Sequence, residues 1–402
     1  MELVTLEELQ AARERVKQVL RPTPVDPSDS LSRLAGRTVL LKPEHRQRTG
    51  SFKIRGAFNR ISQLPPGVPV VAASAGNHAQ GVALAASLTG RRSTIFMPKN
   101  AALPKVAATR DYGATVRLEG DVVDDCLILA QEYAANSDAV FVPPFDDLDV
   151  IAGQGTLGLE LAEEAPAGAV VVVPVGGGGL ISGVAAALKL NPTLASRPRV
   201  VGVEAAGAPT MTAALSAGRP VTLERMATMA DGISVARCSE LTLAHTREFV
   251  DEVVTVDEEE ISRAMLLLVE RAKAVVEPSG AASLAAILAG LVGGDGPVVA
   301  VLSGGNVDPL LLTKLIEHGL AAAGRYLTLR IVMVDRVGAL AGLTAALAGL
   351  GLNVLAVEHH RSNRDLAVAE VEVQVTVETR DMAHHGEVVA ALTGAGYRVE
   401  PV

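Results

Sequence analysis

The sequence contains no tryptophan, and aromatic residues make up only 2% of its 402 residues. Because proteins that bind single-stranded nucleic acid stack bases on aromatic side chains, this scarcity and the lack of a basic block argue against nucleic acid as a partner. No apolar run reaches the roughly 18 residues of a membrane-spanning helix, so we expect no membrane partner. The two cysteines, Cys126 and Cys238, lie far apart without metal-type spacing, which indicates a reducing, cytoplasmic compartment.

Small and β-branched residues are abundant instead. Apolar residues make up 49% of the chain, there are 38 glycines, and the formal net charge is −9. This composition suits an α/β protein in which helices pack closely on parallel sheets. The length favours two or three domains.

Short apolar runs alternate with helical patterns through the first 320 residues, which predicts two open, twisted, parallel sheets. Thr5 and Glu8 have the spacing of a capping box, and Asp257 is expected to cap a helix over 258–273. Further helices are expected at 78–88 and 122–133. The expected strands are 38–42, 68–73, 93–97, 115–118, 140–142, 169–175, 200–203 and 298–302. We expect one catalytic domain over residues 1–320, with a smaller subdomain at about 46–150.

The remaining residues, 325–402, have a different pattern. Strand, helix, strand, strand, helix and strand are expected in turn, which is the ferredoxin-like order. Their ranges are 326–334, 337–350, 353–360, 368–377, 382–392 and 397–399. The segment resembles an ACT domain, a regulatory module that often binds amino acids between subunits, with Gly338 in its first strand-to-helix turn. An oligomerisation domain without a ligand is the alternative.

Lys53 lies in the run from Arg48 to Ala57, between a Gly-Ser-Phe turn and an apolar residue. Partial desolvation there would lower the pKa of its amine and favour the neutral, nucleophilic form. A lysine that bonds covalently to a carbonyl needs that form. The alternative is an ordinary surface lysine at a helix start, with Ser51 as the N-cap.

Four glycines, Gly176, Gly177, Gly178 and Gly179, lie between an apolar strand and a helix. Uncrowded backbone N–H groups at a helix N-terminus form a cradle for phosphate. No Lys-Ser/Thr pair follows the glycines, so this is not a nucleotide P-loop. The spacing also differs from that of the dinucleotide-binding motif.

Two other loops also begin where expected strands end. The run from Ser74 to Gly81 supplies a hydroxyl, an amide and several helix N-terminal N–H groups, and Ser303 begins a Ser-Gly-Gly-Asn run. A carboxylate could bind those N–H groups while Asn77 reaches a ring oxygen. By itself, His78 is explained as well by a structural hydrogen bond. Ligands of open α/β sheets bind at the carboxyl ends of strands, so we expect these loops to converge.

A lysine amine, a phosphate cradle, an amide for a ring oxygen and a hydroxyl for a ring nitrogen together describe a pyridoxal phosphate site. In order and spacing, the four motifs resemble those of the fold type II pyridoxal phosphate enzymes. This fold, with two open parallel-sheet subdomains, is also described as tryptophan synthase β-like. Within that group, the chain is similar to the threonine dehydratase and serine racemase branch. The resemblance extends from about residue 5 to residue 320.

The resemblance implies how the cofactor would be held. Lys53 would bond covalently to it and remove the substrate Cα proton, with Phe52 packed beside the ring. Asn77 would bind the phenolic oxygen, and Ser303 would face the pyridine nitrogen. Gly176, Gly177, Gly178 and Gly179 would hold the phosphate.

The resemblance also implies a substrate site, made by Ser74, Ala75, Gly76, Asn77 and His78, which would take the substrate carboxylate. Gly232 is expected to line the cofactor pocket, and Glu277 matches the family without a defined role. Some relatives hold a cation near the phosphate loop. Glu204 matches one ligand and Ala208 offers a carbonyl, but Thr210 stands where an acid is common, so no metal site is assigned.

The implied reaction is dehydration and deamination of L-threonine to 2-oxobutanoate and ammonia, and of L-serine to pyruvate. A neutral Ser303 limits carbanion delocalisation and favours loss of a β leaving group. Racemases of this branch have a second serine where this chain has Ala75, which favours dehydration over racemisation. A racemase or β-replacement enzyme and a non-catalytic amino-acid sensor stay as alternatives. A homo-oligomer, dimer or tetramer, is expected, with isoleucine or valine as candidate effectors of the ACT-like domain.

Overall fold

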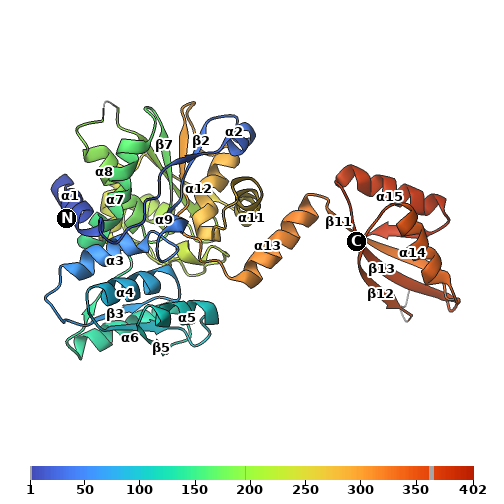
Figure 1. Cartoon of the computed structure of the whole chain (residues 1–402), viewed down its shortest axis with the longest axis horizontal. Coiled ribbons are helices and arrows are strands. Elements are labelled where there is room, and N and C mark those ends of the chain that lie inside the picture. The colour runs from blue at the N-terminus through green and yellow to red at the C-terminus, as the bar shows by residue number, and fades with distance from the viewer. Residues whose placement is uncertain (1, 195, 362–365) are drawn as a thin grey trace. The chain divides into compact units, whose positions relative to one another are not determined.

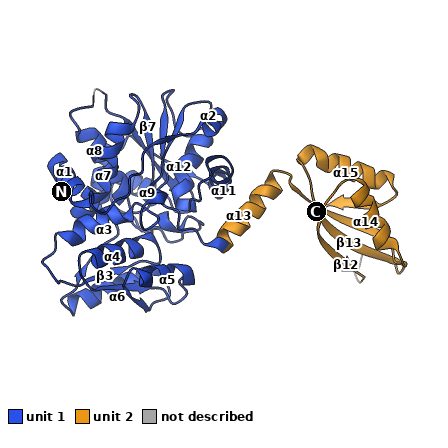
Figure 2. Ribbon diagram, in the orientation of Figure 1, with its two compact units in different colours: residues 1–309 blue, residues 310–402 orange. Residues whose placement is uncertain are grey.

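The computed structural model describes residues 2–194, 196–361 and 366–402. The chain divides into two compact units, residues 1–309 and 310–402 (Figure 2). Each unit has its own sheets and its own hydrophobic core. Among the described residues, no helix is both long enough and apolar enough to cross a membrane.

The larger sheet of the first unit has six strands in the order β1-β2-β10-β7-β8-β9 (Figure 1). They are β1 (Asp26–Pro27), β2 (Val39–Lys42), β7 (Val170–Pro174), β8 (Arg199–Ala205), β9 (Glu252–Val256) and β10 (Val298–Val301). Neighbouring strands are parallel, as predicted, except that β1 pairs antiparallel with β2. The sequence did not indicate this short antiparallel edge strand, and the predicted parallel sheet is otherwise confirmed. Proline cannot donate to a sheet ladder, so an edge is where a strand containing Pro27 can pair.

The smaller sheet has four parallel strands in the order β5-β4-β3-β6. They are β3 (Val70–Ala73), β4 (Ser93–Met97), β5 (Thr115–Leu118) and β6 (Val140–Phe141). All four residues of β3 are buried, and so are all five of β7 in the larger sheet. Strands covered on both faces are continuously apolar, which is why these valine-rich runs could be recognised in the sequence.

Helices cover both sheets (Figure 1). Around the smaller sheet they are α3 (Lys53–Ser62), α4 (Asn77–Leu88), α5 (Leu103–Asp111) and α6 (Val123–Ala135). The others in the first unit are α1 (Leu6–Val16), α2 (Asp29–Ala35), α7 (Leu148–Glu164), α8 (Gly179–Leu190), α9 (Thr210–Ala217), α10 (Glu240–Phe249), α11 (Glu258–Leu267) and α12 (Pro278–Leu288). Short helical turns are η1 (Glu44–Arg46), η2 (Asp231–Ile233) and η3 (Leu268–Ala272).

The predicted caps are confirmed. Thr5 and Glu8 form a capping box at α1, and Asp257 forms one at α11. The prediction of one helix over 258–273 is wrong in part, because α11 ends at Leu267 and a π-helical turn follows. That turn ends at Lys273, which has a φ of 56° and so cannot continue a right-handed helix.

The second unit begins with α13 (Pro309–Ala322), after which the predicted βαββαβ order is confirmed. Its antiparallel sheet has the order β12-β13-β11-β14. The elements are β11 (Tyr326–Val334), α14 (Ala339–Gly349), β12 (Val354–His360), β13 (Glu370–Glu378), α15 (Met382–Gly394) and β14 (Arg398–Pro401). One face of the sheet packs on the two helices around Leu329, Ile331, Val373 and Val375, all fully buried. Gly338 has a φ of 84° before α14, a conformation that favours glycine.

Candidate active site

Lys53 is the first residue of α3, and its ammonium group lies in a desolvated environment. Its Nζ donates to the carbonyl of Pro144 at 3.0 Å and lies 5.1 Å from the ring centre of Phe52. Burial lowers the pKa of Lys53 to about 8, and the nearby Glu277 carboxylate opposes part of that shift. The shift has the direction that the sequence predicts. Ser51 is not the N-cap, because Phe52 holds that position and makes no side-chain cap.

The loop after β10 is joined to the lysine segment by backbone hydrogen bonds. The N–H of Phe52 donates to the carbonyl of Ser303 at 3.1 Å, and the N–H of Gly305 donates to the carbonyl of Gly50 at 2.8 Å. Ser51 and Gly304 form an antiparallel bridge between these contacts. Ser303 and Lys53 are 250 positions apart in the sequence, yet their segments pair side by side.

The amide of Asn77 joins three of the loops. Its Nδ2 donates to Glu277 Oε1 at 2.6 Å, and its Oδ1 accepts from Asn306 Nδ2 at 2.7 Å. Asn306 Nδ2 also donates to the carbonyl of Thr49 at 2.7 Å. Asn306 therefore fixes which way the Asn77 amide points and links it to the lysine segment.

Glu277 is buried beside this amide. Burial, and less strongly the Asp231 carboxylate, raises its pKa to about 7 against the opposing effects of Asn77, Lys105 and Lys53. Although Glu277 precedes α12, its side chain makes no cap there. The role that the sequence left open is thus a contact with Asn77, not a helix cap.

The segment from Ser74 to His78 leads into α4. The first N–H groups of a helix have no intrahelical partner, so this end can bind a carboxylate. Ala75 and Gly76 are partly exposed, and the N–H of Gly76 donates to Ser74 Oγ at 3.1 Å. His78 is buried and its Nε2 bonds to the carbonyl of Val142 at 2.9 Å, so only its backbone is available to a substrate. Burial lowers the pKa of its imidazole to about 3.

The glycine run forms a tight turn between β7 and α8. Gly178 has a φ of 93°, and a Cβ built on Gly177 would lie 2.2 Å from a ring carbon of Phe145. Phe145 follows Pro144, whose carbonyl accepts from Lys53, so the turn lies close to the lysine. Because glycines have no side chains, the backbone N–H groups at the N-terminus of α8 are accessible from the site. Such N–H groups suit the phosphate of the cofactor that the resemblance implies.

Gly177→Ala should weaken binding of pyridoxal phosphate by tenfold or more. The new methyl group would displace Phe145 or the turn itself, and overpacking of this kind typically costs about 1–3 kcal/mol. Titrating the cofactor-free protein with pyridoxal phosphate gives the dissociation constant. Gly386→Ala is a matched control, because a Cβ at Gly386 in α15 would meet nothing within 4 Å. Equal affinity in the two variants would contradict this account of the turn.

Gly232 lies beside Ser279 and Glu277. A Cβ there would lie 2.8 Å from Ser279 Oγ and 3.6 Å from Glu277 Oε1, while a Cβ on Gly176 would lie 2.9 Å from the Cα of Ile233. Within the described part of the chain, the buried hydroxyl of Ser279 has no hydrogen-bond partner. This free donor beside Gly232 also fits a bound polar group.

Glu204 and Ala208 have other partners. The Glu204 carboxylate accepts from the N–H groups of Met211 and Thr212 at 2.6 and 2.9 Å, and from the Thr212 hydroxyl at 2.7 Å. The carbonyl of Ala208 accepts from the N–H of Thr210 at 2.9 Å. Glu204 therefore binds the N-terminus of α9. Among the described residues, no group of three or more His, Cys, Asp or Glu side chains is placed to hold a metal ion.

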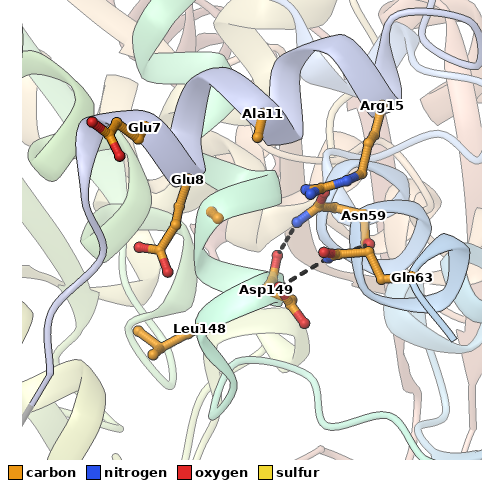
Figure 3. Close-up of a pocket in the computed structure, with 9 residues that line it drawn as sticks. Glu7, Glu8, Ala11, Arg15, Asn59, Gln63, Leu148 and Asp149 are labelled. Atoms are coloured by element: carbon orange, nitrogen blue, oxygen red, sulfur yellow. Dashed lines mark hydrogen bonds between the residues drawn. The ribbon is translucent and has the colours of Figure 1, made fainter.

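A surface pocket of about 300 Å³ lies apart from these residues, between α1, α3 and α7 (Figure 3). Its polar groups bond to one another: Arg15 donates to the Asn59 side chain, Asn59 donates to the Asp149 backbone carbonyl, and Gln63 donates to the Asp149 carboxylate. None of the site residues expected from the sequence lines it.

The site also contains contacts that the sequence did not reveal. Pro144 and Phe145 lie between the lysine and the glycine turn, and Asn306 orients Asn77. The Pro-Pro-Phe run that follows β6 at the carboxyl end of the smaller sheet was the available signal for the first two. No local signal distinguishes Asn306 from the polar residues of other loops.

Known family models match both units of the chain. The family model described as "Pyridoxal-phosphate dependent enzyme" matches residues 16–304, and the model described as "ACT domain" matches residues 327–394. The L-threonine ammonia-lyase of Thermotoga maritima is 44% identical over 404 residues, covering 100% of both chains. A second L-threonine ammonia-lyase, from Geobacter sulfurreducens, is 43% identical over 98% of both chains.

Solved structures match most of the chain. The processed form of threonine deaminase isoform 2 from Solanum lycopersicum gives a TM-score of 0.73 at 35% identity, covering 79% of this chain and 90% of that one. Maize serine racemase gives the same TM-score and identity, covering 80% of this chain and 99% of that one. Both kinds of enzyme in the branch that the sequence motifs resemble are therefore represented among the similar structures.

Proposed function

Because the chain belongs to the family of pyridoxal-phosphate dependent enzymes and ends in an ACT domain, we propose that it converts L-threonine to 2-oxobutanoate and ammonia. L-Serine would give pyruvate and ammonia by the same route. The observation that carries the proposal is the meeting of a desolvated Lys53 amine, the Ser303 loop and the Asn77 amide at one site. The full-length similarity to L-threonine ammonia-lyases supports the same reaction.

Each group of the site has a proposed task. The cofactor, when bound, supplies an electron sink for the bond at the substrate Cα. Lys53 removes the Cα proton, which its lowered pKa favours because more of the amine is neutral near neutral pH. Ser303 would face the pyridine nitrogen as a neutral partner, and Asn77 would hold the ring oxygen. The phosphate would be held by the N–H groups of Gly176, Gly177, Gly178 and Gly179, and Phe52 and Gly232 would lie beside the ring.

The substrate carboxylate is proposed to bind at the start of α4, to Ser74 and the N–H groups from Ala75 to His78. Ala75 has no group that exchanges a proton, so the geometry offers Lys53 as the proton-transfer residue at Cα. A racemase, the second candidate that the maize structure suggests, needs a second such group on the other ring face. This difference favours elimination.

Incubating the purified holoenzyme with L-threonine should release 2-oxobutanoate and ammonia in equal amounts. L-Serine should give pyruvate, and chiral analysis of unreacted substrate should show no accumulating D-isomer. D-Serine forming faster than pyruvate would favour the racemase instead. A protein that binds pyridoxal phosphate yet releases no keto acid from either substrate would contradict the proposal.

For the ACT domain, we propose allosteric control by an amino acid such as isoleucine or valine, bound in a homo-oligomer that is a dimer or tetramer. The proposed compartment is the cytoplasm. Rates with threonine at several concentrations, with and without each amino acid, test the control. Sedimentation velocity with and without the effector tests the assembly. If none of these amino acids changes the rate, oligomerisation is the remaining role of this domain.

A further inference from the structure

The first unit has two halves, one built on the larger sheet and one on the smaller sheet. Helix α5 belongs to the smaller half and buries few of its residues there. Of its nine residues, only Val106 and Thr109 are buried, and Leu103 at its start is 80% exposed. A helix with so few apolar contacts has little of the packing that normally stabilises a helix in place. Polar contacts at its two ends must therefore contribute much of its attachment.

Those polar contacts reach segments that carry the candidate active site. Near the N-terminus of α5, Lys105 Nζ lies 2.5 Å from Asp231 Oδ2 in η2, next to Gly232. Just past its C-terminus, the hydroxyl of Tyr112 donates to the carbonyl of Arg48 at 2.9 Å, in the segment that leads to Lys53. The Lys105 side chain is only 17% exposed, which limits screening of its charge by solvent.

A displacement of Asp231 would also displace residues of the candidate active site. Its neighbour Gly232 lies tightly against Ser279 and near Glu277, and Ile233 lies against Gly176 of the glycine turn. A shift of η2 would therefore disturb both the phosphate cradle and the carboxylate that binds Asn77.

We propose that the ion pair of Lys105 and Asp231 is a clasp that fixes α5 to η2 and so holds the two halves of the first unit in register around the active site. Lys105 is then a positioning residue for substrate binding, a kinetic consequence that rests on the proposed threonine reaction. Many surface ion pairs contribute nothing measurable. This one differs because its lysine is largely buried, although Asp231 is 61% exposed, and because α5 buries only Val106 and Thr109.

The proposed ion pair also predicts how substitutions of Lys105 and Asp231 shift the pH at which Glu277 titrates. The charged groups that act on Glu277 are Asp231, which raises its pKa, and Lys105 and Lys53, which lower it; Asn77 lowers it by hydrogen bonding. Removing the Lys105 charge should therefore move the Glu277 titration to higher pH, whereas removing the Asp231 charge should move it to lower pH. A loss of packing alone would not give shifts of opposite sign.

Hydrogen exchange of the holoenzyme tests the clasp without reference to activity. Lys105→Met and Asp231→Asn should each speed exchange in peptides covering 103–112 and 229–234 by about fivefold, as expected for the loss of a charge-assisted hydrogen bond. Lys105→Arg, which keeps the charge, should stay within about twofold of the wild type. Lys99→Met is the matched control, because Lys99 pairs with Asp121 inside the smaller half and both side chains are mostly exposed.

Kinetics with L-threonine test the positioning role. Lys105→Met should raise KM by roughly three- to tenfold, with a smaller change in kcat, because substrate-binding groups are displaced while Lys53 stays intact. Exchange within twofold of the wild type in both variants, or no greater than in Lys99→Met, overturns the clasp. The pH dependence of the threonine reaction is measured for Lys105→Met and Asp231→Asn. The positioning role is overturned if exchange is faster but KM is unchanged and the pH profiles of the two variants shift in the same direction. If the wild type releases no keto acid, the proposed function fails while the exchange result still decides the clasp.

Discussion

Lys53→Met should lower the rate of 2-oxobutanoate formation from L-threonine by at least about 10⁴-fold, because the variant lacks the amine that we propose both bonds to the cofactor and acts as the base at Cα. Positioned acid–base groups alone contribute about 10²–10⁴-fold. Methionine is unbranched like lysine and has no amine, so the surrounding packing should be preserved. The visible absorption band of the lysine-bound cofactor should disappear as well.

The same substitution should stabilise the cofactor-free protein. The pKa of Lys53 falls from 10.5 to about 8 on burial, so at pH 7 the folded protein carries an ammonium ion in an unfavourable place. Between pH 8 and 10.5 the unfolded chain binds more protons at this residue than the folded chain does, so this contribution to stability rises with pH. At pH 7, Lys53→Met should be more stable than the wild type by about 1–3 kcal/mol, and the difference should shrink toward pH 10.5.

Two measurements separate these effects. Stopped assays of 2-oxobutanoate give the rate, and urea denaturation followed by circular dichroism gives the stability, since the chain has no tryptophan to report unfolding by fluorescence. Lys99→Met is again the control, because Lys99 is exposed and lies outside the site. A variant that keeps the visible band or a hundredth of the activity would refute the role assigned to Lys53.

The motifs of the site were predictable because each is a short string at the carboxyl end of a strand. The glycine turn follows β7, the Asn77 loop follows β3 and the Ser303 loop follows β10. Parallel topology brings the ends of β7 and β10 to one edge of the larger sheet. The Asn77 loop belongs to the smaller sheet and is joined to the Ser303 loop by hydrogen bonding to Asn306. The hydrogen bonds between the loops were not predictable, since Asn77 and Glu277 are 200 positions apart and any polar pair in these loops would have seemed equally suitable.

Helix α7 shows how packing can override a weak local signal. It contains Gly153, Gly155 and Gly158, and glycine costs about 1 kcal/mol relative to alanine inside a helix. The sequence therefore gave little indication of a helix over 148–164. Each glycine lets another backbone approach: a Cβ on Gly153 would lie 2.6 Å from the carbonyl oxygen of Arg55, and one on Gly155 would lie 2.9 Å from that of Gly183. Close contact of α7 with α3 and α8 requires residues that disfavour a helix in isolation.

The burial of Arg55 is not evident from its sequence context. Its side chain is fully buried two positions after Lys53. Its guanidinium donates to both oxygens of Glu44 at 2.7 and 2.9 Å, to both oxygens of Glu160 at 2.6 and 3.0 Å, and to the Thr156 hydroxyl at 3.0 Å. This network ties the start of α3 to η1 and α7. The guanidinium holds the pKa of Glu44 below its usual range despite burial.

Arg55→Met should destabilise the first unit by about 3–5 kcal/mol at pH 7, because it leaves the Glu44 carboxylate buried without its charge partner. Arg55→Lys keeps the charge but not the paired hydrogen bonds, so an intermediate loss is expected. The matched control is Arg13→Met, which breaks the exposed pair with Glu163 and should cost less than about 1 kcal/mol. Urea denaturation followed by circular dichroism measures all three variants.

The pH dependence of this loss identifies its cause. In the wild type, Glu44 contributes stability above its unfolded pKa of 4.5, and the contribution is lost as pH falls through the lower folded pKa. In Arg55→Met the folded pKa of Glu44 should instead rise above 4.5, so protonation between pH 7 and 5 relieves the buried charge. The difference in the free energy of unfolding between wild type and variant should therefore be smaller at pH 5 than at pH 7. If that difference is equal or larger at pH 5, lost packing around the arginine causes the destabilisation, and the unpaired carboxylate does not.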